Sequence, residues 1–211
     1  MIAWRSLGLA CTALGIVAST HGAWAAGAAE QVKSAIDHVL ATVSDPALKG
    51  DEKRAERREA VRKIADGIFD FKEIAHRSLG RYWLPLSDAQ RAEFVDLFAD
   101  LLERSYIPKI EPYGGEKIIY GGERVDGDAA TLSTKIITKN GNAVPIDYRL
   151  LKHGERWMIY DIRVDGISIV LNYRTQFNKI IQASGYNGLV EKMKSKRGQL
   201  AEEDTQKQKR E

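Results

Sequence analysis

The spacing of hydrophobic and polar positions changes between the two halves of the chain. Across residues 28–110, apolar residues recur every three or four positions, as on one side of a helix. Across residues 116–166 they alternate with polar residues, as in strands with one buried face. Helical spacing returns from residue 168. The pattern predicts an α+β fold, with a strongly curved antiparallel sheet of about four strands covered on one face by helices.

Four helices are expected in the first part. The segment 51–70 is rich in opposite charges four residues apart, which is typical of a solvent-exposed helix. A short third helix ends near Gly80. Ser87 with Gln90 three residues later forms a capping box, which predicts the start of the fourth helix.

Four short strands rich in β-branched and aromatic residues follow, and Gly121-Gly122 predicts a bulge in the first. Alternation places Tyr148 of the third strand on the core face. Counting by two along the fourth strand places Met158, Tyr160 and Ile162 on one face as well.

The last part predicts two helices over residues 168–198. Ser168 is a candidate N-cap, and Gly185 separates the two helices. The final segment, 199–211, is charged and is expected to be a disordered tail.

Residues 1–25 differ in kind from the rest. They contain one early cation, Arg5, an apolar run from Leu7 to Ala18, and the triplet Ala23-Trp24-Ala25. These are the three regions of a secretory signal peptide, with cleavage expected after Ala25. A membrane anchor is the alternative, but the apolar run is shorter than the roughly 20 residues that a spanning helix needs. We therefore expect an exported protein with a mature domain over residues 26–198.

The only cysteine, Cys11, lies in this leader. A lipoprotein acceptor cysteine requires Leu three residues earlier, and Gly8 stands there instead. The mature chain is therefore expected to have no disulfide, no thiolate metal site and no cysteine nucleophile.

Candidate chemistry is sparse. His38, His76 and His153 lie on separate predicted elements, which argues against a metal site. The chain has no nucleophile elbow and no glycine-rich phosphate loop. Its formal net charge of +3 is too small to predict a nucleic-acid partner.

Two polar groupings remain open. Tyr148, Tyr160 and Asp161 could form a proton-transfer pocket, although alternation places Asp161 on the opposite face from the tyrosines. Arg174 could hold a phosphate at the mouth of a pocket, or it could form an ion pair with Asp161 or Asp165 and fix the last helix to the sheet. The ion pair is the preferred interpretation.

Four segments carry a resemblance to a known family: "FDFKEIAHRSLGRYW", "AQRAEFVDLFADLLERSY", "PIDYRL" and "WMIYDIRVDGISIVLNYRTQFNKII". In order and spacing they resemble the MlaC family of periplasmic phospholipid-binding proteins, also called toluene-tolerance auxiliary components. The resemblance covers nearly all of the mature chain.

The resemblance implies an NTF2-like sheet with a helical cover around an apolar cavity, in a monomeric carrier with bound phospholipid as cargo and no other cofactor. It implies two partners, an outer-membrane lipoprotein complex and an inner-membrane ABC transporter complex that maintain outer-membrane lipid asymmetry. A hopanoid carrier, a small NTF2-like enzyme and an adaptor protein with a filled core are the alternatives.

Such a cavity needs apolar walls and few polar groups. Arg174 is the candidate head-group residue. The residues expected to bind the lipid are Phe71, Ile74, Leu79, Trp83, Phe94, Leu97, Phe98, Leu101, Ile146, Tyr148, Leu150, Met158, Tyr160, Ile162, Val170, Tyr173 and Phe177.

Overall fold

The fold is α+β, as the spacing of apolar residues predicts. The computed structural model describes residues 27–209, so the predicted signal peptide lies outside the described residues. The helices are α1 (Ala28–Ser44), α2 (Arg54–Ile68), α3 (Phe71–Leu79), α4 (Asp88–Ile110) and α5 (Ile169–Lys209), with short 3-10 turns η1 (Pro46–Leu48) and η2 (Gly80–Tyr82). The strands are β1 (Lys117–Asp126), β2 (Ala129–Ile137), β3 (Ala143–His153), β4 (Arg156–Val164) and β5 (Ile167–Ser168).

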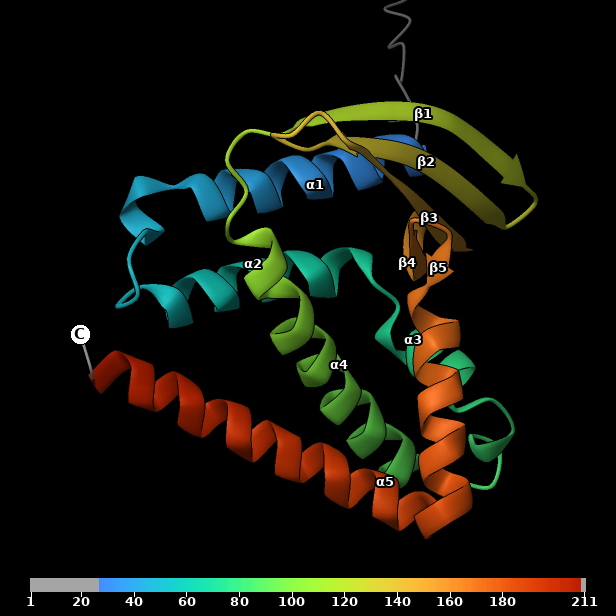
Figure 1. The fold of residues 1–211 in the computed structure, drawn as a ribbon. Coiled ribbons are helices and arrows are strands. Elements are labelled where there is room, and N and C mark those ends of the chain that lie inside the picture. Colours follow the sequence, from blue (N-terminus) through green and yellow to red (C-terminus); the bar gives the residue numbers. More distant parts are fainter. Residues whose placement is uncertain (1–26, 210–211) are drawn as a thin grey trace, which may run out of the picture.

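The strands form one curved antiparallel sheet in the order β1-β2-β3-β4-β5 (Figure 1). Its fifth strand was not predicted, because two residues are too few to show alternation. The predicted bulge in β1 is confirmed, since the pairing with β2 shifts between Tyr120 and Glu123. A Cβ atom on Gly121 would stand 2.9 Å from the Ser133 carbonyl oxygen, so the approach of β2 requires glycine there.

A second bulge, in β4, was not predicted. Arg149 pairs with Asp161 and Leu150 pairs with Ile159, so Tyr160 is an extra residue that has no partner on β3. An extra residue reverses which side chains face the core beyond it. Trp157 and Ile159 therefore face the core on one side of the bulge, and Ile162 does so on the other.

Helix α1 covers the core face of the sheet (Figure 1). The first apolar cluster that we distinguish, the sheet cluster, lies between them and includes the end of α2. Its buried members are Ala28, Val32, Ile68, Ala130, Leu132, Leu150, Trp157 and Ile159.

Helices α3, α4 and α5 pack on one another and enclose a separate helical cluster. The capping box at the start of α4 is confirmed, because Ser87 accepts from the Gln90 amide and the Gln90 side chain accepts from the Ser87 amide. Ser168 also caps α5 as predicted, accepting from the Leu171 amide at 3.0 Å.

Helix α5 bends at Gly185, whose φ of 70° lies outside the helical region. The predicted division into two helices is therefore correct. The helix continues to Lys209, where the sequence predicts a disordered tail from residue 199. This segment is rich in Glu, Gln and Lys, which favour helix and offset its low hydrophobicity.

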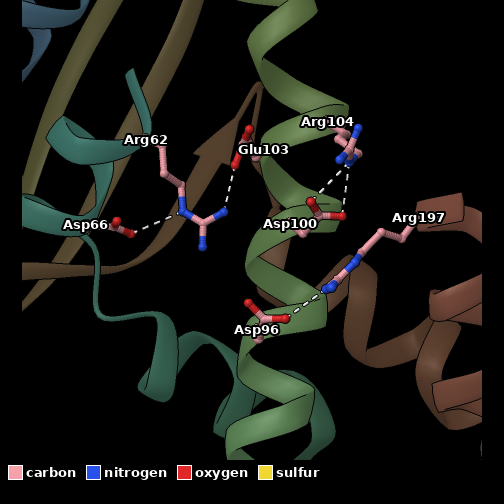
Figure 2. Close-up of polar contacts among 7 residues, drawn as sticks. All are labelled: Arg62, Asp66, Asp96, Asp100, Glu103, Arg104 and Arg197. Carbon is pink, nitrogen blue, oxygen red and sulfur yellow. Dashed lines mark hydrogen bonds and ion pairs between the residues drawn. The ribbon is translucent and has the colours of Figure 1, made fainter. Parts of the chain in front are cut away.

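The polar side of α4 is joined to its neighbours by ion pairs (Figure 2). Arg62 of α2 contacts Glu103 at 2.7 Å, and Arg197 of α5 contacts Asp96 at 2.8 Å. A more buried pair lies at the end of α4, where Arg57 donates to Glu111 and to the carbonyl oxygen of Leu48. Helices α2 and α5 are thus both attached to α4 by charged contacts.

Candidate functional site

Most of the predicted lipid-binding residues on helices meet in the helical cluster. Eight of them are buried there and three are half-buried at its margin. The buried ones are Ile74, Leu79, Trp83, Phe94, Leu97, Phe98, Val170 and Phe177, and the half-buried ones are Phe71, Leu101 and Tyr173.

Aromatic rings form the centre of this cluster. The ring of Phe98 meets those of Tyr173 and Phe177 edge-on, with centroids 4.9 and 5.0 Å apart, and Phe94 meets Phe177 in the same way at 5.6 Å. Such contacts contribute about 0.5–1.5 kcal/mol each beyond the burial of their surface. They fix α5 against α4 along the apolar stripe that the sequence shows.

The predicted residues on the sheet belong instead to the sheet cluster. Leu150 is fully buried there, and Tyr148 and Ile162 are half-buried beside it. Ile146, two residues before Tyr148, is half-buried on the same face. The predicted wall is therefore divided between two clusters, and Phe69 at the end of α2 packs against both.

The shared inward face predicted for Met158 and Tyr160 is wrong. Met158 pairs with Leu151, which puts it on the face opposite Leu150. Tyr160 is buried, but it is the extra residue of the bulge and belongs to neither apolar cluster. The guanidinium groups of Arg77 and Arg149 lie 4.2 and 5.6 Å from the centroid of its ring. The cause is the β4 bulge, which counting by two does not include.

Four other strand residues face the core, and the sequence pattern did not predict them. Trp157 and Ile159 face the core from β4, and Ala130 and Leu132 do so from β2. Alternation along β2 would predict Ala130 and Leu132. The faces of Trp157 and Ile159 depend on the position of the β4 bulge.

Each cluster has half-buried residues at its margin, and Phe69 packs against both clusters. Tyr148 lies at the margin of the sheet cluster, and burial raises its pKa to about 12, while the Thr134 hydroxyl opposes the shift. Burial and then the neighbouring Tyr173 raise the pKa of Tyr106 on the helical side. We take the two margins together as the candidate site and call it the junction: Leu101 and Tyr173 on the helical side, Tyr148 and Ile162 on the sheet side.

The proposed catalytic grouping does not assemble. Asp161 is buried, and its carboxylate accepts from the Ser168 hydroxyl at 2.7 Å and from the Val170 amide at 3.1 Å. It faces away from Tyr148, because its cross-strand partner is Arg149. Both oxygens of Asp161 therefore bind the first turn of α5.

The preferred ion pair of Arg174 is also wrong. Among the described residues, no hydrogen bond or salt bridge joins Arg174 to Asp161 or Asp165. Its guanidinium lies instead against Gly80, with Nε 3.0 Å from the position that a Cβ atom would occupy. The Arg174 side chain is exposed, and it lies where α5 packs on the turn that follows α3.

Two surface hollows lie elsewhere. One of about 540 Å³ lies around Arg57 and Glu111, and one of about 520 Å³ lies between α4 and the second half of α5. Charged and polar residues form most of both linings. Among residues 27–209, no group of His, Cys, Asp and Glu side chains has the arrangement of a metal site. No helix in that part of the chain is long and apolar enough to cross a membrane.

A curved sheet and a helical layer, each with an apolar margin, are typical of a class of small α+β binding proteins. Comparison with known proteins identifies the family within this class. The sequence pattern of the MlaC protein family matches residues 33–195. The chain therefore belongs to the MlaC family.

Individual proteins that the chain resembles support membership in this family. The chain is 28% identical over 147 residues to the intermembrane phospholipid transport system binding protein MlaC of Haemophilus influenzae, covering 67% of this chain and 69% of that protein. It is 25% identical over 129 residues to the toluene tolerance protein ttg2D of Pseudomonas putida, of which it spans 60%. A phospholipid-binding protein from Ralstonia solanacearum, solved in complex with a phospholipid, is 29% identical with a TM-score of 0.75, covering 83% of this chain and 99% of that one.

Proposed function

We propose that this protein is a periplasmic phospholipid carrier. In this proposal it moves lipid between an outer-membrane lipoprotein complex and an inner-membrane ABC transporter complex, and so contributes to outer-membrane lipid asymmetry. The observation that carries the proposal is the likeness to the Ralstonia protein, which holds a phospholipid and matches 83% of this chain. The leader over residues 1–25 supports export, with a mature chain that begins at Ala26.

The junction suits acyl chains physically. Transfer of each methylene from water to an apolar site is favourable by about 0.8 kcal/mol. Two acyl chains therefore provide ample driving force, even after the cost of ordering the lipid and the surrounding side chains. Leu101 is a half-buried apolar residue at the margin of the helical cluster, and Ile162 is one at the margin of the sheet cluster.

The same arrangement favours binding over catalysis. A proton-transfer enzyme on this sheet would need a carboxylate or imidazole at the junction. On β3 and β4, Asp147 accepts from the Ser133 hydroxyl, and Asp161 is engaged with Ser168 and Val170. We therefore propose a binding protein with lipid cargo and no catalytic residues.

A matched pair of substitutions tests the junction. Ile162→Glu places a carboxylate in the space assigned to acyl chains, where desolvating it opposes lipid binding. Ile119→Glu makes the same change on the opposite face of the sheet, where Ile119 is already 42% exposed. We expect the Ile162 variant to purify with less than about a tenth of the wild-type phospholipid per folded chain, which corresponds to about 1.4 kcal/mol or more.

The phospholipid phosphorus of each purified variant gives the readout, and circular dichroism confirms folding. The Ile119 variant should retain its load. A folded Ile162 variant with normal lipid content would remove the junction from the proposed site. If Ile162→Glu does not fold, Leu101→Gln makes the same test from α4.

A further inference from the structure

Two aliphatic side chains are exposed in the segment where the sheet passes into α5. Ile167 of β5 is 66% exposed, and Leu171, four residues later, is 56% exposed. On the other side of the same helix, Val170 and Phe177 are buried in the helical cluster. The first half of α5 therefore carries apolar side chains on its outer surface as well as on its inner one, which is unusual for a helix at the edge of a soluble protein.

Two exposed arginines lie where α5 packs on the turn between α3 and η2. Arg174 follows Leu171 by three residues, and its guanidinium packs on Gly80, whose φ of +55° forms the turn between α3 and η2. Arg81 comes next in that turn and donates to the Tyr82 hydroxyl at 2.9 Å. That hydroxyl in turn donates to the Asn178 side chain of α5 at 3.1 Å, so the turn and the helix are connected.

Over residues 27–209 these arginines form no ion pair, and the exposed carboxylate of Asp165 lies in the β4–β5 turn, two residues before Ile167. Glu73 is the acidic residue of α3, and it contacts Arg77 at 2.7 Å. Asp161 is buried and bonded to the start of α5. Within the part of the chain that the structure describes, no salt bridge joins a carboxylate to Arg81 or Arg174. The surface thus presents two positioned cations beside two protruding aliphatic side chains.

We propose that this surface, the α3–α5 seam formed by Arg81, Ile167, Leu171 and Arg174, docks on the anionic head groups of a phospholipid bilayer. Basic side chains are attracted to anionic lipids, and neighbouring aliphatic side chains enter the boundary between head groups and acyl chains. The seam has protruding side chains and no groove, and a bilayer accommodates these without a complementary pocket.

Docking in this way would also orient the lipid site. Because α5 carries the seam on one side and residues of the helical cluster on the other, the membrane would lie one helix diameter from the cluster. This consequence rests on the proposed carrier function, whereas binding of the seam to a bilayer does not.

Co-sedimentation with vesicles tests the proposal. The mature protein is mixed at low salt with vesicles of phosphatidylcholine alone, or of phosphatidylcholine and phosphatidylglycerol in equal parts. We expect binding to the mixed vesicles only, weakened by added salt because the attraction is screened. The double variant Arg81→Glu/Arg174→Glu should bind more than about tenfold more weakly, and Leu171→Ser should weaken binding at every salt concentration.

Arg124→Glu is the matched control, because Arg124 is an exposed arginine on β1, far from the seam in the sheet order. It should bind as the wild type does.

The proposal would be overturned if the wild-type protein did not bind vesicles that contain phosphatidylglycerol, or if a folded double variant bound them normally. Should the double variant fail to fold, Leu171→Ser decides alone. If the seam variants lose lipid transport in cells while the wild-type protein does not bind vesicles, the seam belongs to an acidic protein partner, and the proposal is overturned. Lipid-loaded protein that does not bind vesicles would leave the carrier function intact.

Discussion

Tyr148 is the residue at the junction whose ionisation reports most directly on its surroundings. Its ring lies among apolar side chains of the sheet cluster, and burial raises its pKa to about 12. An unfolded chain would ionise the same phenol near pH 10. Below pH 10 both states are protonated, so the group has no effect on stability there.

Between about pH 10 and 12 only the unfolded state releases this proton, which favours unfolding as pH rises. In that window the Tyr148 phenol should lower the free energy of unfolding of the wild type by up to about 1.4 kcal/mol per pH unit. We expect Tyr148→Phe to lack this contribution. Urea unfolding of both proteins at pH 9, 10 and 11 measures it. Parallel stability curves across the three values would show that Tyr148 is solvated and that the junction is open to water.

At the scale of elements, the connection between β4 and α5 rests on Asp161. Its two oxygens bind the Ser168 hydroxyl and the Val170 amide, and so position its negative charge at the N-terminus of the helix. In the sequence the same carboxylate is a candidate catalytic base, and only its contacts distinguish the two roles.

Replacing this carboxylate should loosen the start of α5. In Asp161→Asn an NH2 group replaces one carboxylate oxygen. The variant therefore loses one hydrogen bond to the first turn of α5, and it also loses the negative charge at the helix N-terminus. We expect a loss of about 1–3 kcal/mol in the free energy of unfolding, measured by urea denaturation. The control Asp165→Asn changes an exposed residue whose left-handed φ of 49° asparagine also tolerates, and it should stay within about 0.5 kcal/mol. Equal effects of the two substitutions would contradict this role of Asp161.

The elements also show what a sequence can predict here. The Ser87 capping box, the Gly121 bulge and the break at Gly185 each depend on local residue chemistry, and all three were predicted correctly. The bulge at Tyr160 depends on how β4 pairs with a strand elsewhere in the chain. No glycine or proline marks it, so the faces of Met158 and Tyr160 were assigned wrongly.

For the whole molecule, apolar spacing predicted the residues of the helical cluster better than it predicted how they meet the sheet. The apolar stripes on α4 and α5 pack on each other and on α3. The sheet residues pack against α1 and the end of α2. Spacing along one element contains no information about which of two layers it contacts, so the division into two clusters could not be read from the sequence.

Two separately packed layers, each with a half-buried apolar margin, can admit a lipid while each layer keeps its own core. A protein with the proposed carrier function must therefore contain bound phospholipid when it is made in its own cell.

Native mass spectrometry of the protein recovered from the periplasmic fraction tests this requirement most directly. We predict the mass of a chain that begins at Ala26 plus that of a diacyl phospholipid, and collisional activation should release the lipid for identification. A folded protein with the mass of the bare polypeptide would contradict the carrier function. A bound mass that fragments as a hopanoid would contradict the assignment of its cargo, and a chain that retains Met1 would contradict export.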